Sequence, residues 1–218
     1  MSKVKNALLY LMSFQEPIGW LIDKNTESIL DVGCGQGLPM ELIKLRMNPK
    51  HTVGVDLFEP YIREAKAKKI HDKYVLQDIR KLSFKDKSFD TVISLQVLEH
   101  LPKKEAFLLL SKLEKIAKKQ VIVATPIGYM HHPHVDNNPL QEHKSAFSPE
   151  DFEKKGYKTL KFGRKSILGE HAAVHKIQNK HIRRGIYMVN YLLTPLFYFI
   201  QPLSNYHVYA YKKINEQR

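Results

Sequence analysis

Three glycines alternate with other residues directly after an apolar run, in the segment Ile29–Gly37 (ILDVGCGQG). Glycine permits the tight turns and the close approach of backbone to ligand that such a loop needs. Leu38 stands where a dinucleotide-binding loop has its third glycine, and no Gly-Lys-Ser/Thr follows, as a phosphate-binding loop would require. The carboxylate of Asp31, two residues before Gly33, would repel phosphates and attract an ammonium group. The loop therefore predicts a ligand that carries positive charge and lacks phosphate.

Two further aspartates stand at the ends of the next two predicted strands. Asp56 follows Gly37 by nineteen residues, where a carboxylate can accept hydrogen bonds from both hydroxyls of a ribose. Asp78 ends the third strand and can reach an adenine amino group. Each could instead be a helix cap or a surface residue, but three carboxylates in register with one glycine loop favour a shared ligand. S-adenosylmethionine has the matching groups, because it carries an ammonium, a sulfonium, a ribose and an adenine.

The segment 127–147 combines several histidines with Gly, Pro and Asn and has little periodicity, which predicts a long loop. It follows the fifth strand at the carboxyl end of the sheet, so it should lie over the site. His143 and His100 are candidate general bases, because histidine titrates near neutral pH. The candidate contacts to an acceptor are Tyr129, His134, Asp136 and Asn138. These side chains could instead stabilise the loop or bind a metal, but no metal site is predicted, since their spacing matches no standard one.

The elements that must position these residues alternate between β-rich and helical segments. The predicted strands are Ser28–Val32, Thr52–Val55, Tyr74–Gln77, Phe89–Ser94, Gln120–Ala124, Tyr157–Phe162 and His207–Lys212. Helices are predicted at Leu38–Arg46, Pro60–Lys68 and Lys103–Lys118, and Ser148 is expected to cap a fourth. Most of the strands are rich in Val, Ile and Leu, as strands buried on both faces are. This order predicts an α/β fold with helices on both faces of a mostly parallel sheet.

These segments resemble the class I S-adenosylmethionine-dependent methyltransferases, in particular the methyltransferase type 11 group. The resemblance covers about residues 25–126 and rests on Ile29–Gly37, Val53–Asp56, Gln77–Ile79, Phe89–Ser94 and Leu95–Leu101. It implies a Rossmann-like seven-stranded sheet whose last strand is antiparallel, with S-adenosyl-L-methionine as cofactor. The cofactor contacts that it implies are Asp31, Gly33, Cys34, Gly35, Gly37, Asp56, Leu57, Asp78, Ile79, Leu95 and Gln96.

We expect a single methyltransferase domain over residues 1–218. Its parts are a helical N-terminal segment 1–24, a cofactor-binding core 25–126, the active-site loop 127–147 and a helical insertion 163–206. The insertion is first basic and then apolar, and Ile186–Leu203 is long enough to cross a bilayer. Its polar and proline residues argue against a span, as does the need for the last strand to rejoin the sheet. A helix packed on the core or over an acceptor pocket is favoured over contact with an anionic membrane surface.

The chain of 218 residues has a formal net charge of +13 and one cysteine. The charge suits an anionic partner or a merely solubilising surface, and the single cysteine excludes an internal disulfide. We expect a cytoplasmic enzyme (EC 2.1.1), with peripheral contact at the inner membrane face left open. Its expected acceptor is a small molecule or a lipid- or glycan-linked group, methylated at oxygen. The alternatives are an RNA methyltransferase, less favoured because no RNA-binding motif is found, and a non-catalytic protein of this fold that binds a membrane or partner.

Overall fold

The computed structural model describes residues 17–129, 137–162 and 207–214. The chain divides into one compact unit of residues 1–160 and 208–218 and a second of residues 161–207. The elements described here belong to the first unit, apart from the few residues at its boundary with the second. The expected insertion at 163–206 lies outside the described residues, and so does most of the expected N-terminal segment.

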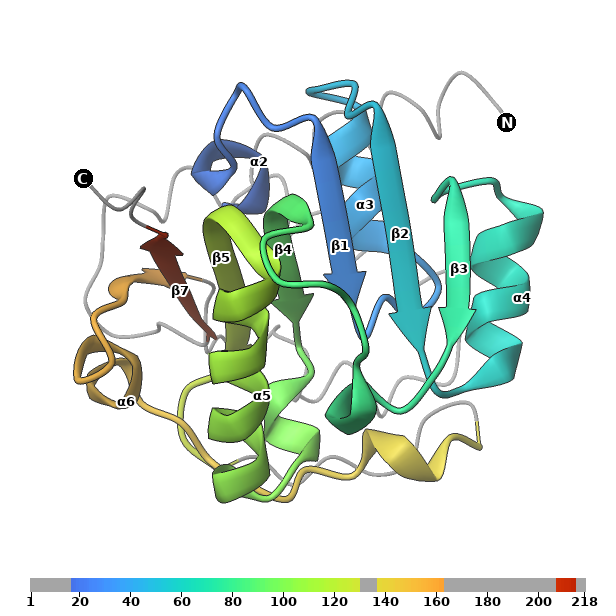
Figure 1. Cartoon of the computed structure of the whole chain (residues 1–218). Coiled ribbons are helices and arrows are strands. Elements are labelled where there is room, and N and C mark those ends of the chain that lie inside the picture. The colour runs from blue at the N-terminus through green and yellow to red at the C-terminus, as the bar shows by residue number, and fades with distance from the viewer. Residues whose placement is uncertain (1–16, 130–136, 163–206, 215–218) are drawn as a thin grey trace, which may run out of the picture. The chain divides into compact units, whose positions relative to one another are not determined.

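Seven strands form one sheet in the order β3-β2-β1-β4-β5-β7-β6. Their bounds are β1 Ser28–Val32, β2 His51–Asp56, β3 Lys73–Leu76, β4 Phe89–Leu95, β5 Ala117–Pro126, β6 Lys158–Phe162 and β7 His207–Lys213. The pairs β1–β2, β1–β4, β2–β3 and β4–β5 are parallel. The arrow of β7 points the opposite way to those of β1 to β4 in Figure 1. The predicted Rossmann-like sheet with an antiparallel last strand is confirmed.

Helices cover both faces of the sheet, which is why β1, β2, β4 and β5 are apolar and buried along most of their length. Figure 1 shows α5 in front of the sheet and α3 behind it. The α-helices are α2 Ile18–Leu21, α3 Leu38–Lys44, α4 Glu59–Ala67, α5 Lys103–Ile116 and α6 Pro149–Glu153. Three short 3₁₀ helices join them: η1 Ile79–Lys81, η2 Leu98–His100 and η3 Pro139–Gln141. In the part of the chain that the structure describes, no helix is long and apolar enough to span a bilayer.

The apolar face of α5 forms much of the core on its side of the sheet. Its buried residues recur at helical spacing and are Ala106, Leu109, Leu110, Leu113 and Ile116. The prediction that this helix continues to Lys118 is wrong. Ala117 turns to extended backbone and pairs with Phe89, so β5 begins directly where α5 ends.

The predicted start of α6 is confirmed by a capping box. The Ser148 side chain accepts from the backbone of Asp151, and the Ser148 amide donates to Asp151 Oδ2 at 2.9 Å. The helix is short and ends at Glu153, three residues before Gly156, whose φ of 80° turns the chain toward β6.

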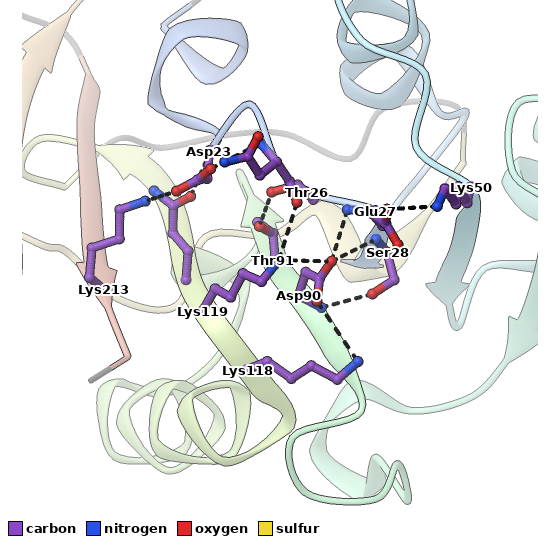
Figure 2. A network of polar contacts seen from close by, with 12 residues as sticks. Asp23, Thr26, Glu27, Ser28, Lys50, Asp90, Thr91, Lys118, Lys119 and Lys213 are labelled. Carbon is purple, nitrogen blue, oxygen red and sulfur yellow. Dashed lines mark hydrogen bonds and ion pairs between the residues drawn. The ribbon is translucent and has the colours of Figure 1, made fainter. Parts of the chain in front are cut away.

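A polar network holds together the amino ends of the central strands (Figure 2). Oδ2 of Asp90, near the start of β4, accepts from the amides of Glu27 and Ser28 at 2.8 and 3.3 Å. The ammonium groups of Lys118 and Lys119, on β5, lie 3.8 and 3.5 Å from the same carboxylate. These contacts stabilise the amino end of the sheet. The predicted site residues lie at the opposite end, where the parallel strands have their carboxyl ends.

Candidate active site

The glycine loop leaves the carboxyl end of β1 and leads into α3. The amides of Gly33 and Cys34 both donate to the carbonyl oxygen of Val55 on β2, at 2.8 and 3.0 Å. Gly33 has a left-handed φ of 75°, and a Cβ placed on it would lie 2.3 Å from Cγ2 of Val97. Glycine is therefore required at this position by both backbone conformation and packing.

Gly35 has a less crowded surrounding than Gly33. Its φ is 52°, and a Cβ placed on it would meet only Tyr61, at 3.9 Å. Gly37 follows at φ 86° and precedes the first turn of α3. Open space beside a bare backbone at the carboxyl end of a parallel sheet is where α/β proteins of this class bind their ligands. The described residues therefore fit a cofactor that lies along the loop at Gly35.

Asp56, at the end of β2, fixes the tip of the loop. Its Oδ2 accepts from the Gly35 amide at 2.8 Å and its Oδ1 from the Phe58 amide at 2.9 Å. Burial raises the pKa of Asp56 above its ordinary value, although these amide hydrogen bonds oppose the rise. A carboxylate oxygen has two lone pairs, so both oxygens keep the capacity to accept from ribose hydroxyls, and that contact stays a prediction.

Asp31 is buried beneath the loop and is paired with His71, which no sequence motif indicated. His71 Nε2 and Asp31 Oδ2 lie 3.0 Å apart, and their side chains are 0% and 2% exposed. Gly54 makes room for this pair, because a Cβ placed on it would lie 3.0 Å from His71 Nδ1 and 2.9 Å from Cys34 Sγ. A polar partner for Asp31 could have been expected, because Asp31 lies on a buried strand and a buried carboxylate needs a buried partner. The contact of Asp31 with an ammonium group stays a prediction.

The expected adenine side of the site is formed after β2 and β3. Asp78 caps η1, where its side chain accepts from the Arg80 amide at 2.9 Å and pairs with the Arg80 guanidinium at 2.6 Å. The Arg80 side chain holds the pKa of Asp78 below its usual range. Leu57 is 43% exposed, and Ile79 is partly buried against the core. Asp78 is thus engaged by Arg80, and its contact with adenine stays a prediction.

The end of β4 adds Leu95, which is half-buried, and Gln96, which is exposed. Gln96 has a left-handed φ of 57°, and its amide donates to the Ala124 carbonyl at 2.8 Å. Such strained backbone at non-glycine residues clusters at functional sites. Cys34 is buried nearby, and burial raises the pKa of its thiol far above the ordinary value, so it is no thiolate nucleophile.

The two predicted histidines, His100 and His143, meet beyond β4 together with Glu99. η2 carries Glu99 and His100, and His143 lies in the loop after η3. The ring centroids of His100 and His143 are 4.9 Å apart, with the rings inclined at 66°. The amides of Lys144 and Ser145 donate to the backbone oxygen of Glu99, at 2.7 and 3.1 Å. The structure therefore brings together both predicted bases and holds them beside Glu99.

Glu99 is the acid of this group, and it is almost completely buried. It is 2% exposed, and its Oε2 accepts a hydrogen bond of 3.0 Å from Thr125 Oγ1. Burial raises the pKa of Glu99 to about 8. Without a cation nearby the side chain is therefore mostly protonated at neutral pH.

The predicted acceptor contacts have different surroundings. Tyr129 is 63% exposed, and its hydroxyl donates to the His143 carbonyl at 3.4 Å, which places it beside the histidines. Asn138 is buried, and its side chain caps η3 by accepting from the Leu140 amide at 3.0 Å. His134 and Asp136 lie outside the described residues.

Comparison with known proteins identifies the domain that carries these features. Residues 30–124, which include the glycine loop, Asp56, Asp78 and Glu99, match a family model described as a methyltransferase domain. This part of the chain is therefore similar to methyltransferase domains. A solved structure of this fold contains S-adenosyl-L-methionine, the cofactor predicted for this chain. No curated protein matches the chain in sequence.

Several solved structures share the fold of this chain. A protein in complex with the Trm112 methyltransferase activator of Haloferax volcanii is 14% identical, with a TM-score of 0.64, covering 99% of this chain and 93% of its own. A SAM-dependent methyltransferase from Archaeoglobus fulgidus is 22% identical, with a TM-score of 0.57, covering 97% and 91%. Magnesium protoporphyrin IX methyltransferase from Synechocystis PCC 6803, with bound SAH, is 16% identical, with a TM-score of 0.57, covering 99% and 89%. At these identities the likeness establishes the fold.

Proposed function

We propose that the methyltransferase transfers the methyl group of S-adenosyl-L-methionine to a hydroxyl oxygen of a small molecule or of a lipid- or glycan-linked acceptor. The observation that carries this proposal is the position of His143. It is 7% exposed, lies against His100 and Glu99, and follows the carboxyl end of the sheet on the same edge as the glycine loop. An oxygen nucleophile needs a group that removes or acidifies its proton, whereas a neutral nitrogen does not.

The chain's residues have two tasks in this reaction. The glycine loop and Asp56 hold the cofactor, and the cluster around His143 activates the acceptor. The sulfonium supplies the leaving group, so the bond from the methyl carbon to the acceptor oxygen forms as the carbon–sulfur bond breaks. The cluster around His143 assists loss of the hydroxyl proton, and S-adenosylhomocysteine is the second product. The rest of catalysis is alignment of the reacting atoms and exclusion of water.

Calorimetry with S-adenosyl-L-methionine tests the cofactor site. We expect Asp56→Ala to weaken binding at least tenfold, because it removes the acceptor of the Gly35 amide and of the ribose hydroxyls. Asp86→Ala is the matched control, since Asp86 is an exposed aspartate of the same domain away from the loop. Absence of binding by the wild type, or equal binding by the Asp56→Ala variant, would refute this site.

A labelled-methyl experiment tests the acceptor. Purified protein and S-adenosyl-L-methionine with a labelled methyl group are incubated with lipid, glycan, small-molecule and RNA extracts. We expect label in one of the first three, bound in a base-resistant ether, as methylation of a hydroxyl gives. Label confined to RNA or to nitrogen would refute the proposal. We also expect His143→Ala to lower turnover strongly while cofactor affinity stays normal. The control is His51→Ala, at the amino end of β2, and unchanged turnover in His143→Ala would exclude a role in activation.

A further inference from the structure

The side chains of Glu99, His100 and His143 have a second property that base catalysis does not use. One potential ligand atom from each lies within 4.8 Å of the others, and among the described residues no other group of three or more His, Cys, Asp or Glu side chains is so arranged. Two of the three are almost fully buried, at 2% for Glu99 and 7% for His143. Small shifts of these side chains would bring all three atoms to the distances that metal coordination requires, about 2.0–2.2 Å from one ion.

The donor set is that of a metal site with open positions. Two imidazole nitrogens and one carboxylate oxygen bind Zn²⁺ in several hydrolases and Fe²⁺ in a group of oxygenases, and in both the ion keeps room for water or substrate. Imidazole also disfavours Mg²⁺ and Ca²⁺, which prefer oxygen ligands. The chemistry of the cluster therefore favours Zn²⁺, Mn²⁺, Fe²⁺ or Co²⁺.

The contacts around the three side chains resemble the outer shell of such a site. The carbonyl of Glu142 lies 3.2 Å from His100 Nδ1, and because a carbonyl only accepts, this nitrogen carries the proton and Nε2 is the ligating atom. Thr125 Oγ1 donates to Glu99 Oε2 at 3.0 Å and orients the carboxylate. The Tyr129 hydroxyl donates to the backbone oxygen of His143 at 3.4 Å. Outer contacts of this kind hold metal ligands in position before the ion binds.

The backbone explains why the cluster is missed in the sequence. Glu99 and His100 are adjacent, whereas His143 is more than forty residues away. The loop that carries His143 is joined to η2 by the hydrogen bonds from the Lys144 and Ser145 amides to the Glu99 carbonyl. The spacing along the chain therefore matches no standard metal motif, although the fold brings the three side chains within 4.8 Å of one another.

We propose that Glu99, His100 and His143 bind one divalent transition-metal ion beside the acceptor position of the methyltransferase. Its binding is independent of the proposed function, but its role rests on it. The hydroxyl oxygen of the acceptor takes an open position on the ion, which lowers the pKa of the hydroxyl, and the proton passes to water. His143 then activates the acceptor as a ligand rather than by taking the proton itself.

Equilibrium dialysis with elemental analysis tests the site on the full chain. Chelator-treated protein is titrated with Zn²⁺, Mn²⁺ and Co²⁺, and the visible spectrum of bound Co²⁺ reports on nitrogen and oxygen coordination. We expect about one tightly bound ion per chain in the wild type, more than about a hundredfold weaker binding in His143→Ala and in Glu99→Gln, and a loss of about 10–100-fold in Thr125→Val. His51→Ala, at the other end of the sheet, should bind as the wild type does.

Two outcomes would overturn the metal site. One is the absence of stoichiometric binding by the folded wild type, and the other is unchanged affinity in His143→Ala and Glu99→Gln, which would place any bound ion on other histidines. Circular dichroism shows that each variant is folded, and Glu99→Gln keeps the shape and the hydrogen-bond acceptor of the original side chain.

Methyl transfer separates this failure from that of the proposed function. If methyl transfer to a hydroxyl is insensitive to chelators but is lost in His143→Ala, His143 acts as the base itself, and the proposed role of the metal in activation is overturned. Tight metal binding without transfer to oxygen would leave the site standing and refute the proposed reaction.

Discussion

Replacement by alanine should destabilise the protein more at Gly33 than at Gly35, the first two glycines of the cofactor loop. In Gly33→Ala the new methyl group would lie 2.3 Å from Val97 Cγ2 and 3.0 Å from Cγ1, at a φ of 75°. In Gly35→Ala the methyl group would meet nothing closer than Tyr61 at 3.9 Å, at a φ of 52°. The two variants therefore share the backbone strain and differ in packing.

The geometry sets the size of the difference. An L-residue in the left-handed region costs about 1–2 kcal/mol, and this applies to both variants. Overpacking a core position costs about 1–3 kcal/mol more, and this applies to Gly33→Ala alone. We expect free energies of unfolding lowered by about 2–5 kcal/mol for Gly33→Ala and about 1–2 kcal/mol for Gly35→Ala.

Val97→Ala supplies the decisive control, because it removes both methyl groups that the new Cβ would touch. In a double-mutant cycle, Gly33→Ala should cost about 1–3 kcal/mol less in the Val97→Ala background than in the wild type. Urea unfolding followed by circular dichroism measures all four proteins. Calorimetry should show the reverse order for function, with Gly35→Ala folded but at least tenfold weaker in binding S-adenosyl-L-methionine. Equal stability of the two glycine variants, or no relief by Val97→Ala, would refute this account of the loop.

Three other substitutions test the environment of the site. In chelator-treated protein the pKa of Glu99 in the folded state is about 8, above its ordinary 4.5. Between these pH values Glu99 holds a proton when folded and releases it on unfolding. The free energy of unfolding of the wild type therefore falls as the pH rises from 4.5 to 8. Glu99→Gln should remove this fall and be more stable at pH 8 by several kcal/mol, up to about 5; parallel urea-unfolding curves for both proteins from pH 5 to 9 would contradict it. His71→Leu leaves the Asp31 carboxylate buried without its partner and should lower the free energy of unfolding by about 3–5 kcal/mol. Adding Asp31→Asn should restore part of that loss, and a double variant no more stable than the single one would count against a stabilising contact between Asp31 and His71. Gln96→Val should cost about 1–3 kcal/mol of stability, because its φ of 57° is unfavourable for a β-branched residue, whereas Gln96→Gly should cost little; equal thermal midpoints would argue against the left-handed conformation.

Much of the fold could be predicted because its signals are local. Buried strands and amphipathic helices leave apolar periods in the sequence, and their alternation dictates a parallel sheet. The boundaries were less accurate where tertiary pairing decided them. Ala117 continues the apolar period of α5, yet it pairs with Phe89 and belongs to β5.

The sequence by itself predicted the cofactor, because Asp31 and the glycine loop lie at the end of β1 and Asp56 at the end of β2, and the carboxyl ends of adjacent parallel strands must meet. Only the tertiary structure decided which side chains these residues contact. His71 reaches Asp31, and His143 reaches Glu99 and His100, across about forty residues of chain. Such contacts depend on how a loop folds back over the sheet, and no period or spacing along the chain records that path. The methyl donor was therefore predicted from the sequence, whereas the contacts that join Glu99, His100 and His143 became visible only in the fold.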